Sequence, residues 1–420
     1  MDLKGKKIAI LGAGRSGMAA AKLAVHFNGT AKISDNNPQL NLPQESQAWM
    51  KKNQVTIETK GHTREFIYES DLVVMSPGVR IDAPAVQWAK EKQIPILGEI
   101  EFAYRFCNKP IIAVTGSNGK TTTATLITEV LAKAGKSPCL CGNVGAPFSQ
   151  HIRDLKAKDF VVLEISSFQL ESIIDFKPHI AVFLNFNKNH LDRHKDMEEY
   201  FAAKKRIFLN QDQNDFAVLN AQDSYVQNLA KEIHSHVIYF NNEKPTDRAW
   251  IKNPNHSAVL AVAKILGIRE VICQEVFSDF RGVEHRLERV RTINGVNFIN
   301  DSKSTTAESG RWAIENFKNP IIMICGGRDK NIDFTILQDL VKQKVKKMYV
   351  IGECREKIKK SFEEFVLVEE CEGMEDAVRR AHTGAVTGDC VLLSPMCASF
   401  DMFTNFEERG KIFKDIVNKL

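Results

Sequence analysis

Three segments of the chain each place a short apolar run directly before a glycine-bearing turn. They are 6–17 (KKIAILGAGRSG), 109–122 (KPIIAVTGSNGKTT) and 319–330 (NPIIMICGGRDK). Around them, short apolar runs alternate with helical patterns of ten or more residues, and this alternation is typical of parallel α/β sheets. A chain of 420 residues can form two or three domains with cores of their own. We therefore predict an α/β protein with a parallel sheet around each of these turns.

The domain boundaries are expected where the pattern changes between these segments. One boundary is expected near 94–102 (IPILGEIEF), and a second near 280–288 (FRGVEHRLE), where a strand-rich pattern begins again. The predicted domains are 1–98, 99–282 and 283–420. We interpret the run 341–350 (VKQKVKKMYV) as one exposed helix face that leads into a strand.

The composition restricts the kind of partner. Lysine and arginine number 57 against 52 aspartate and glutamate, and no arginine-rich or aromatic-studded basic tract indicates nucleic-acid binding. The nine cysteines form no C-x-x-C pair and no zinc spacing, so we expect reduced, mostly buried thiols in a cytoplasmic protein. Glycines and a helical pattern follow the first apolar run, which favours a first strand over a signal peptide. No apolar run approaches the roughly 20 residues of a membrane span.

The first turn, GAGRSG, fills the pattern G-x-G-x-x-G with Gly12, Gly14 and Gly17, after a predicted strand and before a predicted helix. Such glycines allow a tight turn and bring a pyrophosphate close to a helix N-terminus. Asp35 ends the next predicted strand, where an acidic residue could bind the ribose of a nicotinamide cofactor. No hydride-transfer site follows, so the identity of the ligand stays open, and a packing turn without a ligand is the alternative.

The second turn, GSNGKT, differs in spacing from the common phosphate loop G-x-x-x-x-G-K-[ST]. Counting back five positions from Gly119 reaches Val114, which is not a glycine. The functional parts are nevertheless present: a strand, a glycine loop, Lys120 and then Thr121 at the start of a helix. Backbone N–H groups and the lysine would hold phosphates, and the threonine hydroxyl would reach Mg²⁺. We predict an ATP site, with a structural strand–turn–helix as the alternative.

Candidate metal ligands follow the predicted phosphate loop. A strand within 160–171 places Glu164 at its carboxyl end, where open α/β sheets bind ligands. The segment 189–208 adds two histidines, an aspartate and a lysine pair, namely His190, Asp192, His194, Lys204 and Lys205. A glutamate with a histidine can form an oxygen-and-nitrogen shell for Mg²⁺. Taken singly, a residue of either type is more often hydrogen-bonded within the fold.

Beyond these turns, a series of short motifs runs through the chain in order. Besides TGSNGKTT, the series is GNVG (142–145), EISSFQL (164–170), NHLDRH (189–194), AAK (202–204), EHR (284–286), INDSKST (299–305), GGRDK (326–330) and LLSPMCASFDMFTNFEERG (392–410). With this series the chain resembles the Mur ligase family, the ATP-dependent amide ligases of peptidoglycan precursor synthesis. The shortened phosphate loop is the form that this family uses. GAGRSG and the stretch 392–410 resemble the members that add D-glutamate.

The resemblance implies three α/β domains with different ligands. The first would be Rossmann-like and bind the UDP of UDP-N-acetylmuramoyl-L-alanine, with no nicotinamide. The second would be a P-loop ATPase-like domain with ATP and two Mg²⁺, and the third a Rossmann-like domain for D-glutamate that closes onto the second. The substrate acid would be activated as an acyl phosphate, which the amine of D-glutamate attacks. The resemblance further implies a monomeric, bacterial cytoplasmic enzyme without nucleic-acid binding or membrane insertion.

The resemblance also assigns individual residues. Implied contacts to the UDP-linked substrate are Arg15, Ser16, Asp35, Asn36, Ser76, Gly78 and Asn143. Implied ATP contacts are Gly116, Ser117, Asn118, Gly119, Lys120, Thr121, Thr122, Asn253 (adenine), Arg286 (phosphates) and Asp301 (ribose). Implied D-glutamate contacts are Lys303, Thr305, Lys330, Ser399 and the backbone of Phe406. The implied metal ligands are Thr121, Glu164, His190 and Lys204, and the implied catalytic set is Lys120, His190, Lys204 and Arg286.

Lys204 is implied to carry a carbamate that reaches toward the metal. A lysine ammonium beside two Mg²⁺ is repelled and desolvated, so its pKa should fall and the free amine can add CO₂. Lys205 lies about 100° further round a helix, so we expect it to face elsewhere. A surface lysine pair is the alternative that composition alone favours.

Three positions depart from the family pattern. Asn189 stands where an acidic residue is common, and His256 and Thr306 stand where asparagine is common. We therefore expect the metal charge balance and the adenine contacts to differ most from the family.

Four other functions fit these motifs less well. A folylpolyglutamate synthase would begin with its ATP domain, and an L-alanine-adding ligase fits the stretch 392–410 less well. A nicotinamide-dependent dehydrogenase leaves the phosphate loop without a role. A non-catalytic nucleotide-binding regulator does not explain why Lys120, Glu164, His190 and Arg286 occur together.

Overall fold

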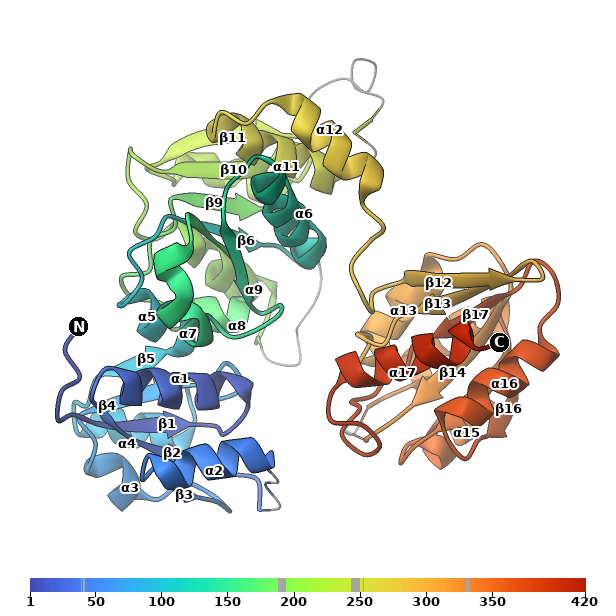
Figure 1. Cartoon of the computed structure of the whole chain (residues 1–420), viewed down its shortest axis with the longest axis horizontal. Helices are drawn as coiled ribbons and strands as arrows, with labels where there is room; N and C mark the ends of the chain where they lie inside the picture. The colour runs from blue at the N-terminus through green and yellow to red at the C-terminus, as the bar shows by residue number, and fades with distance from the viewer. Residues whose placement is uncertain (39, 41, 188–193, 243–249, 252, 330–331) are drawn as a thin grey trace. The chain divides into compact units, whose positions relative to one another are not determined.

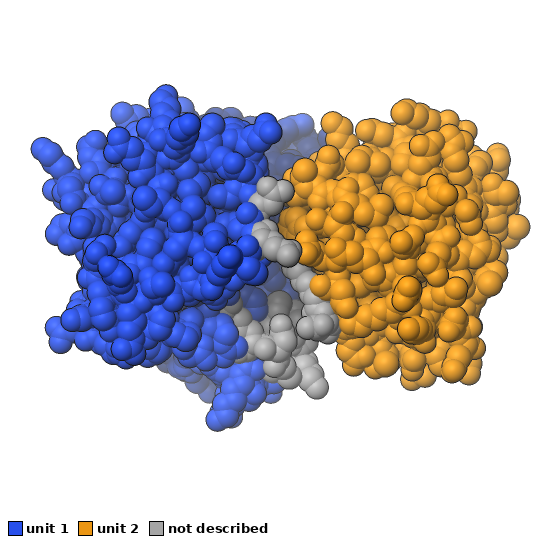
Figure 2. All heavy atoms as spheres, turned by 90° about the horizontal axis from the view of Figure 1, so that it is seen from below, with its two compact units in different colours: residues 1–280 blue, residues 281–420 orange. Residues whose placement is uncertain are grey.

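Each of the three glycine-bearing turns follows a strand of a different sheet (Figure 1). The computed structural model describes residues 1–38, 40, 42–187, 194–242, 250–251, 253–329 and 332–420. The chain divides into two units, Met1–Phe280 with two sheets and Arg281–Leu420 with one, which Figure 2 colours separately. The predicted α/β class is therefore confirmed.

The first sheet has five parallel strands in the order β3-β2-β1-β4-β5. The strands are β1 (Lys7–Leu11), β2 (Thr30–Ser34), β3 (Thr56–Glu58), β4 (Leu72–Met75) and β5 (Ile96–Gly98). Helices α1 (Arg15–His26) and α2 (Gln44–Lys52) pack on one face, and α3 (Arg64–Tyr68) and α4 (Pro84–Glu91) on the other. Because the strand order reverses at β1, the first glycine turn lies at the edge where such sheets bind ligands.

Helix α5 (Glu99–Tyr104) joins the first sheet to the second. The buried carboxylate of Glu101 accepts hydrogen bonds from the N–H groups of Ile174 (2.8 Å) and Phe176 (3.0 Å). One apolar cluster, which includes Phe102 and Phe148, extends over residues of both sheets. This shared core explains why the first 280 residues form one unit.

The second sheet has six parallel strands in the order β11-β10-β9-β6-β8-β7. The strands are β6 (Ile111–Thr115), β7 (Pro138–Gly142), β8 (Phe160–Glu164), β9 (Ile180–Phe183), β10 (Phe216–Asn220) and β11 (His236–Phe240). One face is covered by α6 (Lys120–Lys133), α11 (Pro254–Ile265) and α12 (Glu270–Asp279). The other face carries α7 (Phe148–His151), η1 (Ile152–Ala157), α8 (Ser167–Leu170), α9 (Met197–Lys205), η2 (Arg206–Phe208), α10 (Ser224–Asn228) and η3 (Leu229–Lys231). With both faces covered, these strands are continuous apolar runs, as in β6.

The third sheet has the order β12-β13-β17-β14-β15-β16, in which only the β12–β13 pair is antiparallel. The strands are β12 (Glu288–Ile293), β13 (Val296–Asn300), β14 (Ile321–Gly326), β15 (Val345–Ile351), β16 (Leu367–Glu370) and β17 (Cys390–Leu393). One face packs against α13 (Ala307–Glu315), η4 (Thr335–Leu337), α14 (Gln338–Lys344) and α15 (Arg355–Phe362). The other packs against α16 (Met374–Gly384) and α17 (Phe406–Asn418). The predicted passage from helix to strand in 341–350 is confirmed by α14 and β15.

Smaller expectations from the sequence are also met. The first apolar run forms β1, at the centre of its sheet. All nine cysteines are free thiols, and eight of them are buried. Within the described ranges, no helix has the length and apolar character that a bilayer crossing requires.

Candidate active site

The phosphate loop connects β6 to α6 at the carboxyl edge of the second sheet. Gly116 (φ +146°) and Gly119 (φ +83°) both have backbone angles that L-residues with side chains rarely adopt. A Cβ atom on Gly119 would lie 2.4 Å from Oδ1 of Asn255, so a side chain at this position would displace Asn255. The glycines let the backbone turn sharply into the first turn of α6, as an anion-binding loop requires.

The segment after β9 braces this loop. The N–H of Ser117 donates to the carbonyl of Asn185 (2.9 Å), and the N–H of Asn118 donates to Oδ1 of the same residue (2.9 Å). The Ser117 hydroxyl accepts a hydrogen bond from the N–H of Asn187 (2.9 Å). These three hydrogen bonds hold the loop in place, and this role of Asn185 and Asn187 was not predicted from the sequence. The available signal was the polar stretch NFN directly after an apolar strand.

Two lysine side chains converge on one carbonyl of the loop. Lys120 Nζ donates to the carbonyl oxygens of Gly116 (2.9 Å) and Ser117 (3.0 Å). Lys204 Nζ, from α9, donates to the same Gly116 carbonyl (2.9 Å). The loop therefore has two amine nitrogens within hydrogen-bond distance of its first residue.

The two neighbouring lysines of α9 lie in opposite environments. Lys204 is only 1% exposed, and burial, reinforced by the charge of Lys120 and opposed by Glu164, holds its pKa well below the usual lysine value. Lys205 is exposed and forms an ion pair with Glu232 (2.8 Å). The expectation that Lys205 faces away from the environment of Lys204 is confirmed. The low pKa also agrees with the expectation for Lys204, although burial is the largest cause here.

Glu164 ends β8 directly beside the loop strand. Its side chain is 2% exposed, and Oε1 accepts a hydrogen bond from Nδ2 of Asn143 (2.7 Å). Oε2 is buried and has no hydrogen-bond partner among the residues that the structure describes. Leaving a buried carboxylate oxygen unpaired is unfavourable, and a divalent cation bound there would satisfy it. The residues present thus fit a Mg²⁺ ion at Glu164.

The other predicted metal ligands are only partly accounted for. Thr121 lies in the first turn of α6 and is 2% exposed. His190 lies outside the described residues. Among the residues that are described, no group of three His, Cys, Asp or Glu side chains is arranged to hold a metal ion.

The first glycine turn is held by residues predicted to bind the UDP-linked substrate. Oδ2 of Asp35 accepts a hydrogen bond from the N–H of Ala13 (2.7 Å), and the Ser76 hydroxyl donates to the carbonyl of Gly12 (3.3 Å). The structure thus brings Asp35 and Ser76 together at the turn. Asn36 follows Asp35 and Gly78 lies near Ser76 in the sequence, while Ser16 lies in the first turn of α1.

The loop after β7 connects this turn to Glu164. Arg15 donates a hydrogen bond to the carbonyl of Gly145, and Asn143 of the same loop donates to Glu164. Arg15 and Asn143, both predicted to contact the UDP-linked substrate, are therefore part of one connected set of residues within the first unit.

A hollow lies between the loop after β4 and α8. Its polar lining includes Ser76, Gln169 and Glu99, and its apolar lining includes Met75, Val79 and Phe168. Glu99 is 2% exposed, and burial raises its pKa.

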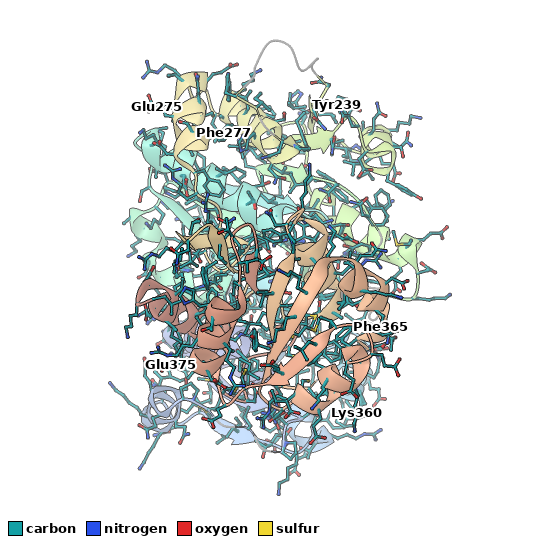
Figure 3. The ribbon with its side chains drawn as sticks, turned by 90° about the vertical axis from the view of Figure 1, so that its right-hand side faces the viewer. Tyr239, Glu275, Phe277, Lys360, Phe365 and Glu375 are labelled. Carbon is teal, nitrogen blue, oxygen red and sulfur yellow. The ribbon has the colours of Figure 1, made fainter. Side chains whose placement is uncertain are left out.

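The start of α11 carries the predicted adenine contact. The exposed side chain of Asn253 caps this helix by accepting a hydrogen bond from the N–H of His256 (3.2 Å). The His256 ring is buried and stacks on Phe277 of α12, with 4.1 Å between centroids; Phe277 is labelled in Figure 3. The ring that replaces the common asparagine is therefore part of the core.

In the second unit, Asp301 connects residues 285–287, called the Arg286 segment below, to the end of β13. Oδ1 accepts a hydrogen bond from the N–H of Leu287 (3.2 Å), and Oδ2 accepts one from the Ser394 hydroxyl (3.1 Å). Asp301 is 3% exposed, and burial raises its pKa to about 7. Both carboxylate oxygens therefore have protein partners, in addition to the ribose contact predicted for this residue.

Arg409 of α17 joins the loops that carry the predicted D-glutamate contacts. It is fully buried and donates to the hydroxyl (3.0 Å) and carbonyl (2.9 Å) oxygens of Ser302 and to the carbonyl of Cys397 (3.0 Å). The Ser302 hydroxyl donates to the carbonyl of Phe406 (2.7 Å). The segments of Lys303, Thr305, Ser399 and Phe406 are thereby held together, while Lys330 lies outside the described residues.

The buried role of Arg409 was not predicted from the sequence. Its signal was an arginine on the face of a helix whose other inward positions are apolar. Burial lowers the pKa of this arginine to about 10.

Models of protein families match three stretches of the chain. Residues 6–98 match the Mur ligase MurD-like N-terminal domain, residues 114–282 the Mur ligase middle domain, and residues 285–397 the Mur ligase glutamate ligase domain. Each stretch contains one of the three sheets or most of it.

Whole-length relatives give the same assignment. A UDP-N-acetylmuramoylalanine--D-glutamate ligase of Koribacter versatilis is 38% identical over an alignment of 449 residues that covers 100% of this chain and 99% of the relative. A ligase of the same name from a Thermoanaerobacter species is 39% identical, with 100% of both chains covered.

Solved structures agree with the fold. The UDP-N-acetylmuramate-alanine ligase MurC of Thermotoga maritima has a TM-score of 0.59 and 20% identity, with 99% of each chain covered. MurF ligase of the same organism, solved with ADP, has a TM-score of 0.56 and 16% identity over 100% of this chain and 96% of that one. Together with the whole-length relatives and the three matching domain models, these similarities show that the chain belongs to the Mur ligase family.

Proposed function

We propose that this protein is an ATP-dependent ligase that adds D-glutamate to UDP-N-acetylmuramoyl-L-alanine in peptidoglycan precursor synthesis, with release of ADP and phosphate. The observation that supports the chemistry most directly is the convergence of Lys120 and Lys204 on the Gly116 carbonyl. The unpartnered Oε2 of Glu164 lies in the same buried set of side chains. The names of the whole-length relatives support the choice of acid and amino acid.

The proposed reaction has two steps. A carboxylate is a poor electrophile, because its leaving group would be an oxide ion. Transfer of the ATP γ-phosphoryl group to the muramoyl-alanine carboxylate forms an acyl phosphate and releases ADP. The amine of D-glutamate then attacks the acyl carbon, loses a proton, and displaces inorganic phosphate as the amide bond forms.

The side chains supply alignment and positive charge for the first step. Phosphoryl transfer requires little covalent participation from the protein and depends on neutralising the negative oxygens. Lys120, now bonded to loop carbonyls, can turn its ammonium to the phosphates when they enter the loop. Arg286 is proposed to add a second cationic group, with five N–H donors.

Glu164 and the hydroxyl of Thr121 are proposed to hold Mg²⁺, together with His190 and a carbamylated Lys204. The ion, when bound, supplies charge neutralisation for phosphate oxygens. Burial lowers the pKa of Lys204 well below the usual lysine value, and this favours the neutral amine that can attack CO₂. The new N–C bond forms as the amine loses a proton, and the product is an anion suited to a metal.

The remaining predicted contacts are proposed in the same roles as before. Arg15, Asp35, Ser76 and Asn143 would bind the UDP-linked substrate, and their grouping in the first unit supports this. Lys303, Ser399 and Phe406 would bind D-glutamate. Such substrates occur in the cytoplasm of peptidoglycan-making bacteria, where we propose that the enzyme acts as a monomer with domains 1–98, 99–282 and 283–420.

The decisive experiment measures phosphate release from the purified full chain with ATP, Mg²⁺ and UDP-N-acetylmuramoyl-L-alanine. Each amino acid is added in turn, with L-glutamate as the matched control for D-glutamate. We expect release only with D-glutamate. Equal release with L-alanine or L-glutamate, or release that needs no amino acid, would contradict the assignment.

The acyl phosphate can be tested separately with ¹⁸O in the alanine carboxylate of the substrate. The proposed steps move one labelled oxygen into the inorganic phosphate. Unlabelled phosphate would exclude the intermediate while leaving the ligase assignment intact.

A further inference from the structure

Arg286 lies in a segment whose backbone is strained on both sides. His285 (φ +63°) and Leu287 (φ +45°) have left-handed angles, although neither is glycine. Such angles are unfavourable for residues with large side chains and persist only where surrounding contacts enforce them. The contacts here are hydrogen bonds from Leu287 N–H to Asp301, from Lys303 N–H to the His285 carbonyl (3.0 Å), and from His285 N–H to Glu288 Oε2 (2.9 Å).

The ring of His285 is tightly packed against its neighbours. A Cβ atom on Gly410 of α17 would lie 2.2 Å from Nδ1 of His285, so the ring packs directly against this glycine. His285 Nδ1 also lies 2.9 Å from Nδ2 of Asn300. The backbone that carries Arg286 is therefore fixed from α17, from β13 and from the loop after β13.

The side chain of Arg286 lies over the aromatic ring of Trp312. Its guanidinium carbon lies 5.3 Å from the centroid of the Trp312 ring, over the ring face. Within the described part of the chain, the guanidinium makes no hydrogen bond and no ion pair. Its N–H donors are thus not used by protein acceptors, whereas its flat face is held by an aromatic ring.

Trp312 is not explained by packing of α13. The buried positions of this helix are Ala307, Gly310, Ala313 and Ile314, whereas Trp312 is 37% exposed. A large aromatic side chain that contributes little to the core, and that carries an arginine on its face, limits the rotamers that the arginine can adopt. An arginine restrained in this way loses less conformational freedom when an anion binds.

We propose that Trp312 is a positioning residue for Arg286, which keeps the guanidinium ready for the phosphate oxygens of the reaction described above. The inference rests on the proposed function, and it concerns Trp312 alone. The ring would act through the arginine and would not touch the reacting atoms. It follows that the quadrupole of an aromatic ring is needed at this position, and apolar volume alone is not sufficient.

The test compares Trp312→Phe with Trp312→Leu in D-glutamate-dependent phosphate release. We expect Leu to lower kcat about tenfold, in the range of a cation–π contact, while Phe retains most of the activity. KM for D-glutamate and the melting temperature should stay unchanged in both. The matched control is Trp88→Leu. Next to the first sheet, the guanidinium carbon of Arg64 lies 5.6 Å from the centroid of the Trp88 ring, over the ring face. This variant should keep the wild-type kcat.

A second arm places Trp312→Leu on an Arg286→Met background. If Trp312 acts through Arg286, the Leu substitution should lower the remaining kcat less than twofold there. The proposal is overturned if Trp312→Leu matches the wild type, if Phe is as harmful as Leu, or if Leu costs the same tenfold without the arginine. If Arg286→Met leaves no measurable turnover, the contrast between Phe and Leu decides. A wild-type enzyme without D-glutamate-dependent release would contradict the proposed function instead.

Discussion

The phosphate loop of the first unit and the Arg286 segment of the second both use left-handed backbone, but they obtain it differently. The phosphate loop places glycine at both such positions, Gly116 and Gly119. The Arg286 segment places His285 and Leu287 there. Glycine adopts these angles without a Cβ clash, whereas histidine and leucine need neighbours that hold them. The left-handed angles are thus specified by local residue type in the phosphate loop and by tertiary contacts in the Arg286 segment.

This difference explains what each loop can tolerate. A locally specified loop depends on residue type, and adding a methyl group is enough to disturb it. A loop held by tertiary contacts depends on Asp301, Lys303 and Gly410, which come from distant parts of the sequence. Four predictions test this contrast, in order of decreasing effect.

The largest effect is expected at Lys204, which lies directly against the phosphate loop. Lys204→Ala removes an amine that bonds the Gly116 carbonyl and should lower turnover by about 10³-fold or more, as loss of a preorganised charge does. Lys205→Ala is the matched control, because its side chain is exposed and paired with Glu232. It should stay within about twofold of the wild type, as surface pairs contribute little. Equal losses in both variants would show that the phosphate loop does not depend on Lys204.

The next prediction concerns Asp301, which holds the Arg286 segment through Leu287. Burial raises its pKa from 3.8 to about 7, so the protonated form stabilises the fold. This stability is complete below pH 3.8 and is lost as the pH rises through about 7. Between pH 5 and 7 the loss is two units at about 1.4 kcal/mol each, or about 3 kcal/mol.

Chemical denaturation at pH 5 and pH 8 checks this expectation. Asp301→Asn, which cannot ionise, should lose less stability than the wild type over the same interval. The same pH dependence in both proteins would mean that Asp301 does not titrate near pH 7, and that the segment is held without it.

The same contrast shows what the sequence could and could not predict. The glycine turns and the three sheets were predictable, because residue type and periodicity determine them locally. The special environment of Lys204 was predicted only through the resemblance to the Mur ligase family. The bracing by Asn185 and Asn187, the buried Arg409 and the contact between Trp312 and Arg286 were not predicted. Each of them joins residues from separate elements, and single-sequence patterns carry no information on such pairs.

The third prediction compares two glycines of similar backbone angle. Gly119→Ala (φ +83°) and Gly135→Ala (φ +78°) should each destabilise the fold by about 1 kcal/mol, because alanine is strained at such angles. A Cβ on Gly135 would meet nothing within 4 Å, whereas one on Gly119 would meet Asn255. Only Gly119→Ala should therefore shift the loop and lower kcat/KM for ATP, by about 10²-fold. Full activity of Gly119→Ala would mean that the loop tolerates a side chain after all.

The smallest effect is expected from the strained leucine, and it tests the second half of the comparison. Leu287→Ala and Leu287→Gly both remove the isopropyl group beyond Cβ and its apolar contacts, so they differ only in Cβ. At φ +45° glycine is relaxed and alanine is not, so the glycine variant should be the more stable of the two by about 1 kcal/mol. At an unstrained position the order would be reversed, because glycine has more freedom in the unfolded chain. Scanning calorimetry of the full chain therefore detects the strain beside Arg286 from which of the two variants is the more stable. A more stable alanine variant would show that the segment is not strained.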